Sequence, residues 1–300
     1  MQSIELSVPV VPPLGANLLV PPGARAAALF IQGSGVHDRD GSMPAVGFQS
    51  TLYRRVAREL AQRCALAGLR YDKRGHDLPA PGPQDYTIES RLADAAAALA
   101  LLRSRPECSG LPLFLLGHSE GALVAAKLAE REAVRGVVCL AAPWGNVFEL
   151  NRDRARRLLA NAGTRERGER AVAFHDILER LFREGSRILP EQFVELAQPY
   201  FGTGYQGWES FEWLAGHWAG ALQSDPTGKG TPMLVVQGGR DARLWDDNAQ
   251  RWQQWCAGRP LARYHLVAHM GHDLNDARQK TFRVDDAVLD LICGFVRELA

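Results

Sequence analysis

The sequence predicts an α/β protein with a mostly parallel sheet, helices on both faces and an inserted helical segment. Apolar runs with the length of buried strands alternate with segments of helical periodicity, which is typical of parallel sheets. The alternation stops near residue 145 and resumes near residue 230, and only helical periodicity lies between them. The 300 residues are 46% hydrophobic and 23% charged, which excludes a coiled coil and a largely disordered chain.

The elements expected in residues 1–145 follow from this alternation. Short strands separated by turns occupy the first 32 residues, and the apolar run Ala26–Ile31 leads directly into a glycine loop. The elements expected after that loop are a helix over 49–67, a strand over 69–72, a helix over 88–102, a strand over 111–116, a helix over 121–131 and a strand over 134–142.

Residues 146–229 are expected to form a helical insertion in a core domain made of residues 1–145 and 230–300. The elements expected after the insertion are a strand over 233–237, a helix over 245–256, a strand over 262–267 and a helix over 285–299. Ligands of such sheets bind outside the carboxyl ends of the strands. Because the insertion leaves and re-enters the core at that edge, we expect it to cover the site as a cap.

The strongest motif is Gly117-His118-Ser119-Glu120-Gly121, which follows an apolar strand and precedes a helical pattern. This is the setting of a nucleophile elbow, in which a sharp turn lifts the serine hydroxyl above the sheet. Glycines two residues before and after the serine allow the close backbone approach that the turn requires. Ser119 is therefore the predicted nucleophile, and an inert serine in a tight turn is the alternative.

A serine nucleophile needs a base and a carboxylate that orients the base, in the chain order serine, acid, histidine. Asp241 follows the strand over 233–237, and His272 follows the last strand and a glycine, so these two are the predicted acid and base. The rival base is His269. The rival acids, Asp246 and Asp247, fall within the next helical pattern.

The oxyanion formed during acyl transfer needs two backbone N–H donors. One is expected from Glu120, the residue after the nucleophile. The other is expected from the loop Gln32–Gly35, with Ser34 as the first choice and Gly35 as the second. A plain glycine turn is the alternative for this loop.

Four segments of the chain carry a family resemblance, and they are Gln32–Gly41, Arg70–His76, the motif around Ser119, and Gly238–Asp241 with Gly271-His272. With these segments the chain resembles the α/β-hydrolase superfamily, in particular serine esterase-like members with a helical cap. The resemblance covers residues 1–145 and 230–300 and implies the α/β-hydrolase fold and an esterase-like activity. Gln32 replaces the histidine of many members, and Asp77 replaces a glycine. Asp72 and Arg74 are expected to organise loops.

The expected function is cleavage of a carboxylic ester through an acyl-enzyme on Ser119, with a mainly apolar pocket under the cap. A peptidase or amidase, a C–C bond hydrolase with the same triad, and a non-catalytic binding protein of the same fold remain as alternatives. The residues expected to line the pocket are Gly33, Gly35, His118, Trp144, Trp208 and Trp213.

The composition argues against several other classes. A net charge of +1 disfavours nucleic-acid binding, and no apolar run approaches the ~20 residues of a membrane span. The five scattered cysteines and the sequence around His269 and His272 lack metal-site spacing, so neither a metal nor an organic cofactor is expected. A cytoplasmic protein acting on a small acyl substrate is expected, and a homodimer is left open.

Overall fold

A computed structural model of the chain describes residues 1–44, 47–77, 86–202, 210–279 and 283–300. Among these residues, eight strands form one sheet in the order β1-β2-β4-β3-β5-β6-β7-β8. The first two strands and their contact with β4 are antiparallel, and the others pair in parallel. The strands are β1 (Gln2–Val8), β2 (Leu14–Val20), β3 (Ala26–Ile31), β4 (Leu66–Tyr71), β5 (Leu113–His118), β6 (Gly136–Leu140), β7 (Met233–Gly238) and β8 (Ala262–Val267).

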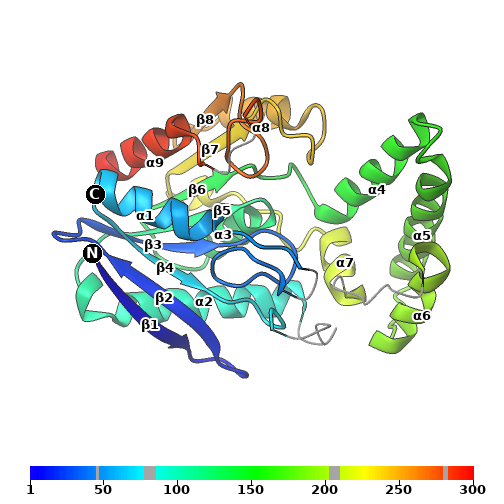
Figure 1. Cartoon of the computed structure of the whole chain (residues 1–300), viewed down its shortest axis with the longest axis horizontal. Helices are drawn as coiled ribbons and strands as arrows, with labels where there is room; N and C mark the ends of the chain where they lie inside the picture. The colour runs from blue at the N-terminus through cyan, green and yellow to red at the C-terminus, as the bar shows by residue number, and fades with distance from the viewer. Residues whose placement is uncertain (45–46, 78–85, 203–209, 280–282) are drawn as a thin grey trace.

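Helices cover both faces of this sheet (Figure 1). α1 (Leu52–Cys64) and α9 (Asp286–Leu299) pack on one face, and α2 (Ile88–Ser104), α3 (Glu120–Ala129) and α8 (Asn248–Ala257) pack on the other. Strands covered on both sides must be apolar on both sides. Every residue of β3, β4, β5 and β6 is buried accordingly.

The described residues between β6 and β7 form helices joined by turns and loops, without a strand. It contains α4 (Val147–Arg157), α5 (Arg165–Arg183), α6 (Pro190–Phe201) and α7 (Phe211–Trp218). Two short 3-10 helices, η4 (Leu158–Ala160) and η5 (Pro226–Lys229), lie in the same segment, and η3 (Pro106–Cys108) lies between α2 and β5.

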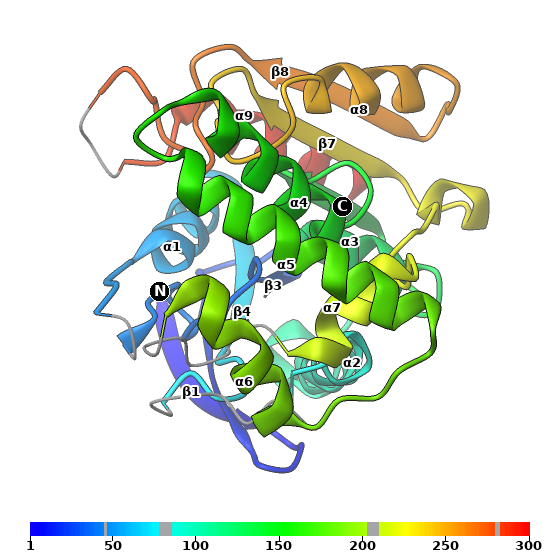
Figure 2. The same cartoon turned by 90° about the vertical axis from the view of Figure 1, so that its right-hand side faces the viewer.

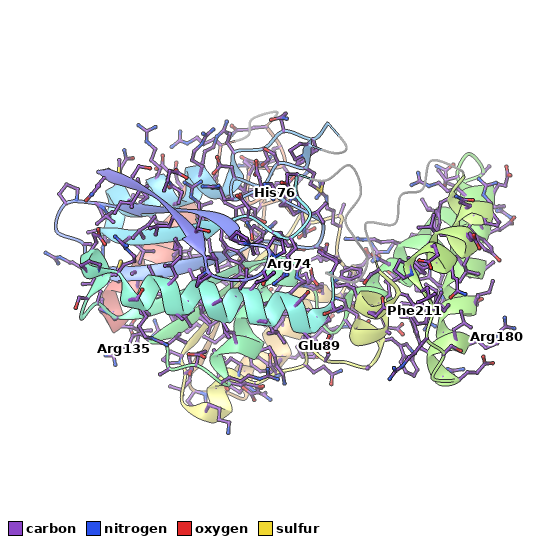
Figure 3. The ribbon with its side chains drawn as sticks, turned by 90° about the horizontal axis from the view of Figure 1, so that it is seen from below. Arg74, His76, Glu89, Arg135, Arg180 and Phe211 are labelled. Carbon is purple, nitrogen blue, oxygen red and sulfur yellow. The ribbon has the colours of Figure 1, made fainter. Side chains whose placement is uncertain are left out.

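These inserted helices lie at one end of the molecule. α7 is next to the sheet domain, and α4, α5 and α6 extend beyond it (Figures 1 and 2). Figure 3 shows Phe211 between the two parts and Arg180 on the outer side of α5. Phe148, Phe174, Phe182 and Phe211 are buried in the same apolar cluster as the helices of the sheet domain. The insertion is therefore attached to the sheet domain by a continuous apolar core.

The predicted α/β fold with an inserted helical segment is confirmed, and most of the element ends differ from the expected ones by a few residues. One of the larger differences, of three residues, is at the helix expected from residue 245, which begins only at Asn248. Asp247 stands at the N-cap position, so neither it nor Asp246 lies within the helix. The division into a core domain and a cap domain remains a prediction.

Candidate active site

Ser119 lies in the turn that joins the end of β5 to the start of α3. Its backbone has φ 55° and ψ −127°, a strained conformation that a non-glycine residue rarely adopts. The turn leaves Ser119 partly exposed although its neighbours His118 and Glu120 are buried. A strained, accessible serine at a helix N-terminus is the geometry that the sequence motif predicts.

The two flanking glycines are required by close packing. A Cβ on Gly117 would lie 2.2 Å from the carbonyl oxygen of Gly121. A Cβ on Gly121 would lie 2.2 Å from the carbonyl oxygen of Ile31. Both distances are far below any real Cβ contact, so the turn can form only with glycine at these positions.

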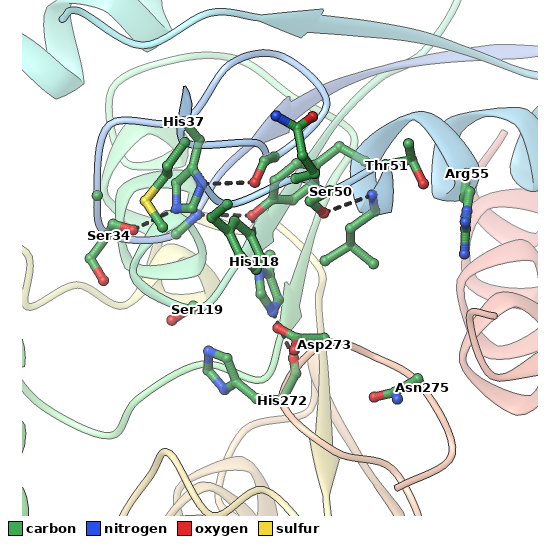
Figure 4. A pocket seen from close by; sticks show the side chains of 18 of the residues that line it. Ser34, His37, Ser50, Thr51, Arg55, His118, Ser119, His272, Asp273 and Asn275 are labelled. Atoms are coloured by element: carbon green, nitrogen blue, oxygen red, sulfur yellow. Dashed lines mark hydrogen bonds between the residues drawn. The ribbon is translucent and has the colours of Figure 1, made fainter. Parts of the chain in front are cut away.

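His272 and Asp241 come together from the loops after β8 and β7. The Nδ1 atom of His272 lies 2.8 Å from Oδ2 of Asp241, and their side chains are 8% and 2% exposed. An anionic carboxylate at Nδ1 favours the tautomer with its proton there, which leaves Nε2 as the free base. His272 and Ser119 line the same pocket (Figure 4).

The rival residues have other partners. His269 Nε2 lies 2.5 Å from Oδ2 of Asp285, the residue that caps α9, and His269 is not among the residues that line the pocket. Asp246 pairs with Arg157 and its side chain is 97% exposed, while Asp247 pairs with Arg251 on the next turn of α8. The structure therefore brings together the three residues that the sequence favours.

The direction of the Ser34 backbone N–H, in the loop after β3, follows from the hydrogen bonds of its neighbours. Gly33 N donates to the hydroxyl of Tyr53, and Gly35 N donates to the hydroxyl of Tyr86. The carbonyl of Gly33 accepts hydrogen bonds on its buried side from Lys73 and Arg91. Because the N–H of a trans peptide points opposite to its carbonyl, Ser34 N–H points away from these cations. No hydrogen bond donated by Ser34 N is found among the described residues.

The second expected donor is the N–H of Glu120. It is the first residue of α3, where backbone N–H groups have no partner within the helix. The carboxylate of Glu120 was missed by the sequence analysis. It is fully buried and lies 2.6 Å from Arg91. Burial raises the pKa of this carboxyl, but Arg91 and the hydrogen bond from His217 outweigh burial and lower the pKa to about 2.

His118 lies beside His272, the predicted base, and its two ring nitrogens have other partners. Its ring centroid is 5.1 Å from that of His272, and its Nε2 lies 2.8 Å from the carbonyl oxygen of His272. Its Nδ1 lies 3.0 Å from the hydroxyl of Tyr53. Burial, and then the neighbouring His272, lower the pKa of His118 to about 4.

A pocket of about 580 Å³ opens in front of Ser119, between the loops around residues 33–55 and 272–275 (Figure 4). Apolar surface from Met43, Phe48, Leu52 and Tyr53 forms much of its wall. The other lining residues are Gly33, Ser34, Gly35, His37, Gly41, Gln49, Ser50, Thr51, Arg55, His118, Ser119, Arg243, His272, Asp273 and Asn275. Gly33, Gly35 and His118 are thus found where they were expected.

This geometry agrees with the comparison to known proteins. The profile described as "Alpha/beta hydrolase family" matches residues 28–284, which is most of the chain. The chain belongs to the alpha/beta hydrolase family. The matched range begins in β3 and ends just before α9, so it includes the whole insertion and Ser119, Asp241 and His272.

Several esterases resemble this alpha/beta hydrolase. "Esterase EstD" of Thermotoga maritima is 25% identical over 279 residues, which are 91% of this chain and 60% of the relative. The chain therefore spans only about three fifths of that protein's length. Among solved structures, an esterase from Pyrococcus furiosus matches with 15% identity and TM-score 0.56, over 99% of this chain and 90% of the other. A malate-bound thermophilic esterase from Thermogutta terrifontis matches with 18% identity and TM-score 0.53, over 100% of this chain and 99% of the other.

The tryptophans expected in the substrate pocket of this alpha/beta hydrolase are not found there. Trp213 is fully buried in α7 and donates from Nε1 to Glu120. Trp144 packs edge-on against Trp252 of α8, with ring centroids 5.1 Å apart. Trp208 lies outside the described residues. The expectation was wrong for Trp144, which packs against another residue of the sheet domain, and for Trp213, whose indole fills the joint between insertion and sheet domain. No described residue of 146–229 lines the pocket.

The described part of this alpha/beta hydrolase offers no group of three His, Cys, Asp or Glu side chains that could hold a metal ion. Within the same residues, no helix is both long and apolar enough to cross a membrane. The five cysteines are all buried, free thiols.

Proposed function

We propose that this chain is a serine hydrolase that cleaves a carboxylic ester through an acyl-enzyme on Ser119. The observation that carries the proposal is the grouping, around one pocket, of a strained serine, a histidine held by a buried aspartate, and an outward Ser34 N–H. The similarity to Esterase EstD supports the choice of an ester as substrate.

The proposed reaction begins when Ser119 Oγ attacks the acyl carbonyl while His272 Nε2 takes the hydroxyl proton. Asp241 holds the imidazole and stabilises its charged form. The carbonyl oxygen becomes an oxyanion and accepts hydrogen bonds from Ser34 N–H and Glu120 N–H. His272 then gives the proton to the departing alkoxide, and an ester C–O bond breaks. Water, deprotonated by His272, then attacks the acyl carbon, the bond from that carbon to Ser119 Oγ breaks, and His272 returns the proton to Oγ as the acid leaves.

The pocket favours a small acyl substrate with an apolar group. The side chains of Met43, Phe48 and Leu52 offer that group an apolar wall beside the nucleophile. We therefore place the specificity in the loops around residues 41–55 rather than in the tryptophans of the insertion. Residues 146–229 are proposed as a cap domain that acts on the site through α7.

The deciding experiment is the intact mass of the protein after treatment with a fluorophosphonate, with Ser119→Ala as the matched control. A single adduct on the wild type that is absent from the variant supports an activated Ser119. Absence of an adduct on folded wild-type protein contradicts the proposal and favours a binding protein of the same fold.

A substrate panel then separates the hydrolase classes. We expect turnover of p-nitrophenyl esters with a preference among acyl lengths, and little turnover of the matching arylamides. Ser119→Ala should lower kcat by about 10⁴-fold or more, because the triad acts as a unit. Faster turnover of arylamides than of esters would identify an amidase.

A further inference from the structure

Glu120 follows Ser119 in the chain, and the contacts of its side-chain carboxylate play no part in the proposed reaction. The side chains of Glu120 and Arg91 are 0% and 7% exposed, and Arg91 Nη1 lies 2.6 Å from Glu120 Oε2. Two charges buried this deeply need each other, because an unpaired charge in the interior is strongly unfavourable. The ion pair therefore fixes the position of α2, which carries Arg91, relative to the first residue of α3.

Arg91 also contacts the loop Gln32–Gly35, which we call the oxyanion loop, on its buried side. Its Nη2 donates to the carbonyl oxygens of Gln32 and Gly33, at 3.2 and 3.4 Å. Its Nη1 donates to the hydroxyl of Tyr86, which in turn accepts from Gly35 N. The peptides on both sides of Ser34 are thus held by Arg91, either directly or through Tyr86.

One ion pair consequently connects the two expected oxyanion donors. Ser34 N–H belongs to the same peptide as the Gly33 carbonyl that Arg91 holds, and Glu120 provides the other N–H from its own backbone. Oxyanion donors stabilise the transition state only when they stand at the right distance from the developing charge.

The same carboxylate anchors the insertion. Glu120 Oε1 accepts hydrogen bonds from Trp213 Nε1 at 2.7 Å and from His217 Nε2 at 3.0 Å, both on α7. Val147 N, at the start of α4, donates to His217 Nδ1, which places the histidine proton on Nε2. His217 thereby joins the first and last helices of the insertion to Glu120.

We propose that the buried Arg91–Glu120 ion pair is a positioning unit that sets the spacing of the two oxyanion donors and couples the docking of α7 to catalysis. The inference rests on the proposed serine hydrolase activity. Glu120 and Arg91 do not touch the reacting atoms with their side chains. Their effect is on the transition state, so it should change kcat and leave substrate binding in the ground state nearly unaltered.

The test compares Glu120→Gln with Glu130→Gln as the matched control. Glu130 lies at the end of α3, where it pairs with Lys127 and accepts from Asp225 N, far along the helix from the oxyanion loop. For each protein we would measure kcat and KM with a p-nitrophenyl ester and the inhibition constant of a trifluoromethyl ketone with the same acyl group. Active sites are counted by fluorophosphonate titration.

The ketone forms a tetrahedral adduct with the serine, and its oxyanion reports on the two donors. Glu120→Gln should lower kcat about 10- to 100-fold, which is less than the roughly 10²–10³-fold loss of rate when an oxyanion donor is removed. The inhibition constant of the ketone should rise by a similar factor. KM should stay within about twofold, and Glu130→Gln should match the wild type. Unchanged kcat and ketone affinity per titrated site, with a lower melting temperature, would overturn the proposal.

If Glu120→Gln does not fold, Trp213→Phe provides the test. It removes the indole N–H that donates to the Glu120 carboxylate and leaves the Arg91–Glu120 ion pair intact. We expect a smaller loss of the same kind, about 3- to 10-fold in both kcat and ketone affinity. A folded Trp213→Phe protein with wild-type values would overturn the coupling to α7. Failure of the proposed function itself is distinct, because the wild type would then react with neither the fluorophosphonate nor the ester.

Discussion

His118 holds the backbone of His272, the proposed base, since its Nε2 lies 2.8 Å from the carbonyl oxygen of His272. A carbonyl can only accept, so the proton of the neutral His118 ring is on Nε2 and Nδ1 is an acceptor. Nδ1 then accepts from the hydroxyl of Tyr53, whose oxygen accepts from Gly33 N at 3.2 Å. One line of hydrogen bonds therefore joins the loop of the base to the oxyanion loop.

Tyr53→Phe should break this line without removing the buried ring. Gly33 N and His118 Nδ1 would both lose their partner, which costs about 1–3 kcal/mol for each buried group left unpaired. We expect a lower free energy of unfolding in urea and a kcat reduced about 10-fold, because the oxyanion loop loses one of its supports. Tyr264→Phe on the edge strand β8 is the control, and equal kcat in the two variants would contradict the positioning role of Tyr53.

The choice between the two histidines after β8 can be tested by a pair of substitutions. His272→Gln should abolish most of the turnover, with kcat lowered about 10⁴-fold or more, because the base is lost. His269→Gln should keep kcat within about threefold and lower only the melting temperature, since His269 pairs with Asp285 at the start of α9. A large loss of kcat in His269→Gln with normal folding would point to the wrong base.

Stability should fall in mild acid because His118 resists protonation in the folded protein. Its pKa is about 4 when folded, against an ordinary value of 6.5, so the unfolded chain binds more protons as pH decreases. The stability contributed by the neutral ring is complete above pH 6.5 and is lost as pH falls toward 4. Between pH 7.5 and 5.0 this one group should cost about 2 kcal/mol.

Urea unfolding of the wild type and His118→Asn at these two pH values measures the effect. The difference in unfolding free energy between pH 7.5 and 5.0 should be smaller in the variant by about 2 kcal/mol. Asp241, Asp273 and His272 interact electrostatically with the His118 ring, and all three are present in both proteins. An identical pH dependence in the two proteins would show that His118 is not the responsible group.

The parts of the site that the sequence could predict are those next to strand ends. Ser119, Asp241 and Ser34 each follow a short apolar run, and His272 follows the last strand by a few residues, so local pattern and chain order were enough to bring them together. The mostly parallel sheet with helices on both faces follows from the same alternation. These features depend on local periodicity and on the fixed geometry of parallel sheets.

The pocket wall could not be predicted because it joins distant segments. Residues around Tyr53 and around Asn275 meet across more than 200 positions of the chain, and no local pattern records that contact. The aromatic residues of the insertion suggested a pocket, but Trp213 fills the joint instead. Glu120 and Arg91 did carry a signal, since each is a charged residue within an apolar or alanine-rich helix. A buried partner of opposite charge is the usual explanation of such a position.

The elbow itself provides the strictest test of the fold. Gly117→Ala would place a methyl group 2.2 Å from the carbonyl oxygen of Gly121 and 2.4 Å from Cα of Ala122, both of which are backbone atoms that a rotamer change cannot move. Relief requires α3 to shift away from β5, and overpacking of this kind costs about 1–3 kcal/mol or more. The shift would also displace Ser119 and Glu120 N–H, so kcat should fall together with stability.

Gly228→Ala is the matched control, because nothing lies within 4 Å of a Cβ at that position. We expect its urea midpoint and its kcat to stay near the wild-type values. Gly117→Ala should unfold at a lower urea concentration and, when folded, should react more slowly with the fluorophosphonate. A Gly117→Ala protein with normal stability and normal labelling would mean that β5 and α3 are not packed as closely as described, and the geometry proposed for Ser119 would then be wrong.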